Sequence, residues 1–176
     1  MDNLLNYFIK EPEREFYVRE LAKFTKKSPT TISKYLNKLK KDKLLISKKK
    51  YNHLLFKANT EDQVFKDLKL FYNIKKLREC GLIDYLIEEF NHPEAITLFG
   101  SFRKAENIPK SDIDILIITP LKKKIDLKKF EKILNHEIQL FLHSNEEIEK
   151  MKIQNKDLIN NWINGIVVYG YWGLYK

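Results

Sequence analysis

The most constraining feature of the sequence is a glycine and a serine placed between two apolar runs, the second of which begins with a pair of aspartates. Residues 95–99 predict a strand, Gly100 and Ser101 a tight turn that opens a helix, and residues 112–118 a second, buried strand. Because side chains at i and i+2 of a strand share a face, Asp112 and Asp114 project together from the start of this strand. The chain must therefore fold around a sheet with two neighbouring carboxylates at one end.

The residues of this pattern are suited to binding a cation and a phosphate. Two carboxylates held so close repel each other unless a positive group lies between them, and Mg²⁺ typically takes one or two protein carboxylates together with water and substrate phosphates. Gly100 lets backbone N–H groups approach a phosphate, and Ser101 adds a hydroxyl donor. The segment therefore predicts a site for a magnesium-bound nucleotide.

The pattern of Gly100 and Ser101 followed by Asp112 and Asp114 resembles the nucleotidyltransferase superfamily that includes DNA polymerase beta, and specifically its minimal members. The resemblance covers about residues 82–170 and implies a mixed sheet flanked by helices. It also implies Mg²⁺ with an NTP, expected to be ATP, and transfer of a nucleoside monophosphate such as AMP. The residues it assigns are Gly100, Ser101, Arg103 and Lys104 to the nucleotide, and Asp112 and Asp114 to the metal and to catalysis.

Active members of this superfamily carry a third carboxylate on a later strand, which is expected here over residues 137–142. Gln139 matches that position best, whereas Glu137 lies on the same strand face two residues earlier and would substitute after a shift in register. An amide can bind a metal but cannot act as a general base at neutral pH. We name Glu137 as the catalytic candidate, and the occupant of the third position stays open.

The excess positive charge of the chain lies entirely in its first third. The sequence holds 33 lysines and arginines against 24 acidic residues, and residues 1–60 account for 15 and 6 of these. Such a segment is typical of a module that meets a polyanion. No apolar run reaches the length of a membrane-spanning helix, and the single cysteine, Cys80, excludes an intrachain disulfide, so a reducing cytoplasm is expected.

The basic segment predicts three short helices and a hairpin. Ser28 and Pro29 are the typical start of the third helix, whose apolar residues Ile32, Leu36 and Leu39 recur at helical spacing. Residues 44–46 and 54–56 predict two strands around a cationic turn over residues 47–53.

This order of elements resembles the winged helix-turn-helix family over residues 3–58, through the paired runs 18–22 and 28–36. The resemblance implies binding of double-stranded DNA, with the third helix in the major groove and the hairpin on the backbone. A dimerisation or protein-docking module is the alternative. The expected DNA-binding residues are Thr30, Thr31, Ser33, Lys34, Asn37, Lys38, Lys48, Lys49 and Lys50.

The predicted fold is α+β, with a winged helix over residues 1–60, a connecting helix over residues 61–80 and a nucleotidyltransferase-like domain over residues 81–176. By resemblance, the expected protein is an antitoxin-like transferase that binds DNA, works as a homodimer and modifies either a protein, such as a cognate toxin, or another acceptor. The alternative is a transcriptional regulator whose transferase-like domain only senses nucleotide. An interaction scaffold is disfavoured, because two unbalanced aspartates are costly without a cation.

Overall fold

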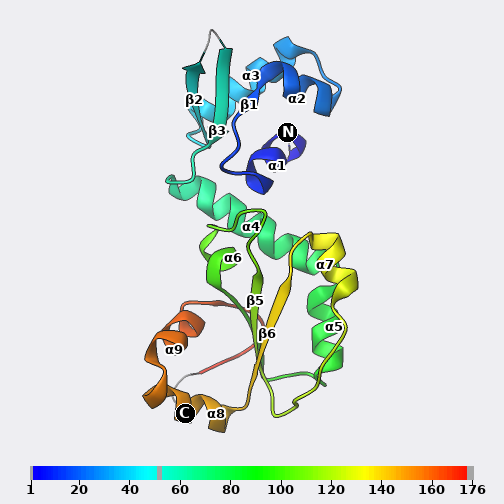
Figure 1. Cartoon of the computed structure of the whole chain (residues 1–176), viewed down its shortest axis with the longest axis vertical. Coiled ribbons are helices and arrows are strands. Elements are labelled where there is room, and N and C mark those ends of the chain that lie inside the picture. The colour runs from blue at the N-terminus through cyan, green and yellow to red at the C-terminus, as the bar shows by residue number, and fades with distance from the viewer. Residues whose placement is uncertain (1, 51–52, 174–176) are drawn as a thin grey trace. The chain divides into compact units, whose positions relative to one another are not determined.

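A computed structural model describes residues 2–50 and 53–173, and its internal contacts divide the chain into two compact units, residues 1–69 and 70–176 (Figure 1). Helix α4 (Gln63–Glu79) crosses this division and occupies the segment predicted as a connecting helix. None of the helices in the described ranges is long and apolar enough to cross a membrane.

The first unit contains helices and a small antiparallel sheet. The helices that precede α4 are α1 (Asp2–Lys10), α2 (Val18–Thr25) and α3 (Pro29–Lys41), and the strands β1 (Phe16–Tyr17), β2 (Leu45–Lys50) and β3 (His53–Ala58) lie in the order β1-β3-β2. The helices and the hairpin thus follow the predicted order. Strand β1 has no counterpart in the sequence prediction, because two residues are too few to show an alternating pattern.

Helix α3 begins as its sequence predicts. The Ser28 hydroxyl oxygen accepts a 3.1 Å hydrogen bond from the backbone N–H of Thr31, and Pro29 occupies the first turn, where its missing N–H leaves no partner unsatisfied. The predicted apolar residues of the helix, Ile32, Leu36 and Leu39, are buried.

The hairpin is longer than predicted. The expectation of a turn over residues 47–53 is wrong for residues 47–50 and His53, which belong to β2 and β3; Lys48 pairs with Leu55 and Lys50 with His53. Tyr51 and Asn52 lie outside the described residues. The strand continues there through backbone pairing with β3. The sequence does not predict this, because three consecutive lysines show no alternation of apolar and polar side chains.

The second unit is a mixed sheet between two layers of helices. Its strands β4 (Ala95–Phe99), β5 (Ile113–Ile118), β6 (Ile138–His143) and β7 (Ile166–Gly170) lie in the order β6-β5-β4-β7. Strands β5 and β6 run parallel, whereas β4 is antiparallel to both β5 and β7. The predicted mixed sheet with flanking helices is confirmed.

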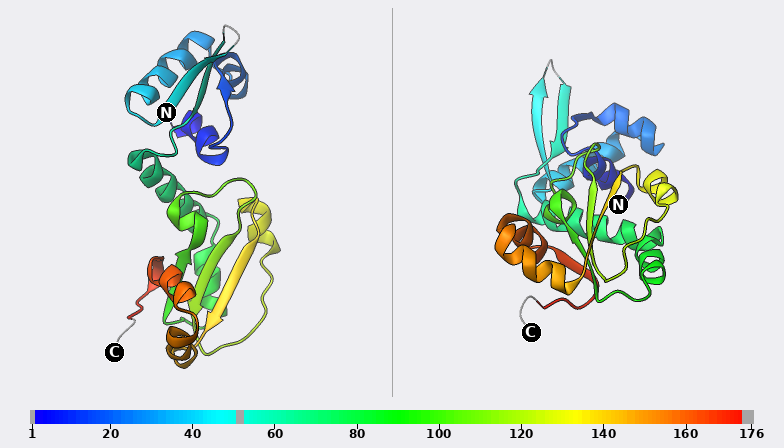
Figure 2. Two further views of the ribbon diagram at one scale, coloured as in Figure 1. Left: turned by 60° about the vertical axis from the view of Figure 1, so that its left-hand side comes forward. Right: turned by 60° about the horizontal axis from the view of Figure 1, so that its bottom comes forward.

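The two faces of this sheet pack against different helices. Ile113, Ile115 and Ile117 share a core with α5 (Leu82–Glu89) and α7 (Lys128–Leu134). The alternate residues Leu116 and Ile118 pack with α8 (Asn145–Gln154) and α9 (Lys156–Ile163), and both pairs of helices can be followed in Figures 1 and 2. Because side chains alternate along β5, Asp114 shares the face of Leu116 and Ile118.

Candidate active site

The turn at Gly100 and the second aspartate lie against each other. Strand β4 ends at Phe99, which pairs with Asp114 of β5, and helix α6 (Gly100–Lys104) begins at the next residue. Gly100 has a φ of 68°, and a Cβ atom built on it would lie 2.2 Å from Oδ2 of Asp114. Only glycine satisfies both the backbone conformation and this close approach. The two parts of the sequence motif therefore form one site.

The two aspartates lie at the start of β5, which is one residue shorter than predicted: Asp112 immediately precedes the strand and Asp114 is its second residue. Burial raises the pKa of Asp114 above its usual value, and the negative charge of Asp112 raises it further. Both causes disfavour the carboxylate form, so the site is one in which a bound cation would relieve an existing electrostatic cost.

The register of β5 and β6 decides which residue lies at the third position. Asp114 pairs with Gln139, and the Gln139 side-chain Nε2 donates a 2.6 Å hydrogen bond to Oδ2 of Asp112. Glu137 lies just before β6, where its backbone carbonyl accepts a 2.9 Å hydrogen bond from the N–H of Ile113. The amide thus stands beside the aspartates, without the shift in register that would bring Glu137 there.

Glu137 nevertheless lies close to the site. Glu137 and Asp112 both line a hollow of about 420 Å³, whose other walls come from Pro109, Lys110, Ser111, Glu131, Asn135 and His136. His136 is fixed there by a 2.7 Å hydrogen bond between its Nδ1 and the carbonyl of Ser111, and by edge-to-face packing on Phe102. An acceptor group in this hollow would meet Asp112 and Glu137 together.

Helix α6 places Arg103 and Lys104, the remaining predicted nucleotide-binding residues, in its last turn. Arg103 Nε is buried, and within the described residues it has no hydrogen-bond partner. A buried donor without an acceptor costs free energy unless a ligand supplies one. Because this atom is closed to solvent, the predicted contact of Arg103 with a phosphate depends on the terminal nitrogens of its guanidinium group.

The residue that anchors α6 lies outside the sequence motif. Asn73 of α4 donates through its Nδ2 to the carbonyl of Phe102 and to Oδ1 of Asn107, each at 2.9 Å, and both asparagines are buried. These bonds tie α6 and the loop that leads to Asp112 to the same helix. No sequence signal marks Asn73, because an asparagine within a helical pattern is ordinarily taken as solvent-exposed.

The predicted DNA-binding residues lie on two elements of the first unit. Thr30, Thr31, Ser33, Lys34, Asn37 and Lys38 are on α3, and Lys48, Lys49 and Lys50 are on β2. The Thr31 hydroxyl is within 2.8 Å of the Ser28 hydroxyl at the helix start, and Lys48 forms an ion pair with Glu15. Thr31 and Lys48 thus already have partners within the chain.

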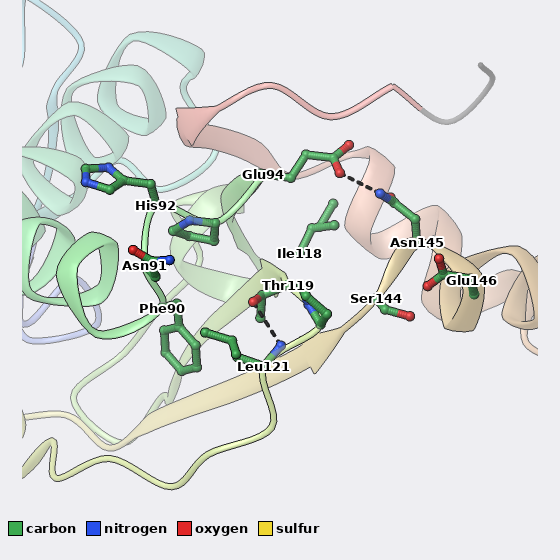
Figure 3. A pocket seen from close by; sticks show the side chains of 12 residues that line it. Phe90, Asn91, His92, Glu94, Ile118, Thr119, Leu121, Ser144, Asn145 and Glu146 are labelled. Atoms are coloured by element: carbon green, nitrogen blue, oxygen red, sulfur yellow. Dashed lines mark hydrogen bonds between the residues drawn. The ribbon is translucent and has the colours of Figure 1, made fainter.

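A second hollow of about 390 Å³ lies at the opposite end of the β4–β5 ladder (Figure 3). Glu94 and Ile118 line it. Glu94 accepts a 2.5 Å hydrogen bond from Asn145, and Thr119 accepts one of 3.1 Å from the N–H of Leu121; Figure 3 draws both as dashed lines. It contains none of the predicted site residues.

The Mg²⁺ ion expected from the sequence would have two carboxylate ligands from the described part of the chain, Asp112 and Asp114. Among residues 2–50 and 53–173, no three His, Cys, Asp or Glu side chains gather closely enough to hold a metal ion. The neighbouring Asp112 and Asp114 still fit Mg²⁺, which needs one or two protein carboxylates when substrate phosphates and water complete its shell. Asp114 of this pair lies against the Gly100 turn, at which α6 begins.

The comparisons with known proteins agree with this geometry. The family described as nucleotidyltransferase domain matches residues 79–169, which is more than half of the chain, and the chain therefore belongs to this family. Its members generally transfer nucleotidyl groups and use Mg²⁺ with an NTP. No curated protein and no solved structure matches the chain significantly.

The contact between Gly100 and Asp114 gives a first test of the site. Gly100→Ala is expected to lower the free energy of unfolding by more than about 1–3 kcal/mol, since it adds the Asp114 clash to an unfavourable φ, and to abolish nucleotide binding. Gly81→Ala is the matched control, because Gly81 has a φ of 78° with nothing within 4 Å of its Cβ position. It should lose about 1–2 kcal/mol and bind nucleotide normally, as measured by chemical denaturation and calorimetry. Equal effects of the two variants would contradict the assigned role of Gly100.

Proposed function

We propose that this protein binds Mg-NTP, with ATP as the expected nucleotide, and transfers its nucleoside monophosphate to a protein acceptor. The observation that carries the proposal is the contact of the Gly100 turn with Asp114, which brings the turn expected to bind phosphate against the carboxylate pair expected to hold the cation. Membership of the nucleotidyltransferase family supports the same chemistry.

Each residue of the site has a separate role in the proposed reaction. The backbone at Gly100 and the Ser101 hydroxyl bind the terminal phosphates, and Arg103 and Lys104 contribute positive charge beside them. Asp112 and Asp114 hold Mg²⁺, which neutralises phosphate charge and polarises the phosphoryl oxygens when bound. Glu137 takes the proton of the acceptor hydroxyl, whose oxygen attacks the α-phosphorus as the bond to the β-phosphate oxygen breaks and pyrophosphate leaves.

The role of Glu137 distinguishes a transferase from a protein that only senses nucleotide. We expect Glu137→Gln to reduce transfer by about 10²–10⁴-fold and to leave Mg-ATP affinity unchanged, because a general base acts on the acceptor and not on the nucleotide. The measurement is transfer of label from α-labelled ATP to proteins of a cell extract, beside calorimetric binding. Glu88→Gln, which neutralises an exposed acid on α5, is the control and should retain transfer.

The alternative function is a regulator that binds nucleotide without turnover, and the amide of Gln139 beside Asp112 favours it. Mg-ATP binding by the unaltered protein with no transferred label and no pyrophosphate release would select this alternative. Transfer that Glu137→Gln leaves intact would instead remove Glu137 from the catalytic assignment.

We further propose that the first unit is a winged helix that binds double-stranded DNA, with α3 in the major groove and the β2–β3 hairpin on the phosphate backbone. The supporting observations are the three helices and hairpin in that order and the confinement of the excess positive charge to residues 1–60. A homodimer on a palindromic site, an antitoxin-like role and a cognate toxin as the acceptor complete this proposal.

A further inference from the structure

Gln139 contacts one aspartate of the candidate active site and is in register with the other. The parallel ladder pairs Gln139 with Asp114, and its Nε2 donates the 2.6 Å hydrogen bond to Oδ2 of Asp112. A neutral amide therefore stands beside both aspartates, where a third negatively charged ligand would have to lie.

The neutral amide at this position limits how many cations the site can hold. Two cations in one catalytic site lie about 3.5–4 Å apart and need carboxylates that bridge them. Two divalent cations also need more negative charge than two carboxylates supply, and the Gln139 amide bonded to Oδ2 of Asp112 adds none. Within the described residues, Asp112 and Asp114 gain no third acidic, histidine or cysteine ligand. The ligands present thus suffice for one cation that shares substrate phosphates, but not for two.

We propose that Gln139 is a positioning residue that limits the site to one divalent cation for each bound nucleotide, because its neutral amide stands beside Asp112 where a third carboxylate would be needed. The inference rests on the proposed function, since a metal-bound nucleotide must enter this site, and it deepens that function by fixing the number of cations. Without a second cation to activate the acceptor hydroxyl, its proton must pass to a side chain, which is the role given above to Glu137.

The test counts cations and does not depend on turnover. The full chain is titrated with Mn²⁺ in the presence of α,β-methylene-ATP, and free Mn²⁺ is measured by electron paramagnetic resonance. We expect about one bound Mn²⁺ per chain for the unaltered protein and about two for Gln139→Glu, which supplies a third carboxylate in the position of the amide. Gln154→Glu, an exposed residue of α8, adds the same charge away from the site and should retain one.

Three results of this titration would contradict the proposal. Two ions bound by the unaltered protein would overturn the limit to one cation and would leave the proposed nucleotide binding intact. One ion in both the unaltered protein and Gln139→Glu would overturn the role of Gln139. No ion bound by the unaltered protein with nucleotide present would overturn the proposed Mg-NTP site and this inference together.

Discussion

Replacing Asp112 and Asp114 together by asparagine is expected to weaken Mg²⁺-dependent nucleotide binding by at least about 100-fold. Contacts to charged groups contribute about 1.5–3 kcal/mol each, and the double variant removes both carboxylates that would face the cation. Asparagine has nearly the shape of aspartate, so the packing of residue 114 against Gly100 and the hydrogen bond between residue 112 and Gln139 can both persist. The loss is therefore one of charge and not of structure.

Protein stability should move in the opposite direction to binding. The pKa of Asp114 is raised by burial and by Asp112, so its charged form is less favourable in the folded than in the unfolded chain. Without Mg²⁺, that cost is absent at low pH and develops as the pH rises through the titration of Asp114. The double variant should consequently melt at neutral pH no lower than the unaltered protein.

Calorimetric titration with ATP and GTP in Mg²⁺, beside thermal melting, checks both expectations. The control is Asp84→Asn with Asp157→Asn, which removes two exposed carboxylates from the first turns of α5 and α9. It should bind as the unaltered protein does. Undiminished nucleotide binding by the Asp112 and Asp114 variant would remove these residues from the site.

The parts of the fold that the sequence predicts well depend on contacts close along the chain. The start of α3 follows from Ser28 and Pro29, and the shared face of Asp112 and Asp114 follows from the two-residue period of a strand. The contact of Gly100 with Asp114 was implicit in the same segment, because a strand, a turn and a returning strand bring their facing ends together. Local rules therefore recover the centre of the candidate site.

The parts that the sequence leaves open depend on pairing between distant segments. Gln139 and Glu137 are two residues apart, and only the register of β6 against β5 determines which one stands beside Asp114. Asn73 reaches Phe102 and Asn107 because α4 packs near α6, which no spacing along the chain encodes. The extension of β2 through its lysines likewise requires knowledge of its partner strand.

Neutralising Lys48, Lys49 and Lys50 with glutamine is expected to reduce DNA affinity at all sequences, by about 10-fold or more at low salt, and to flatten its salt dependence. Each phosphate contact contributes about 0.9 to the slope of log K against log salt, because it releases condensed counterions. Lys48 already pairs with Glu15, so its binding to phosphate must displace an internal carboxylate. We therefore expect the slope to fall by less than the value of about 2.7 that three independent contacts would give.

The ion pair of Lys48 makes a second variant informative, because its effect should have the opposite sign. Glu15→Gln removes the carboxylate that competes with phosphate for Lys48 and should raise DNA affinity and steepen the salt slope. Lys124, Lys150 and Lys156, exposed in the second unit, supply a control of equal charge when replaced by glutamine, and DNA binding should then change little. Fluorescence anisotropy with duplex DNA at several salt concentrations measures all three. If the control triple lowers the slope as much as the β2 triple does, the attraction comes from overall charge, and the hairpin has no specific contact with the backbone.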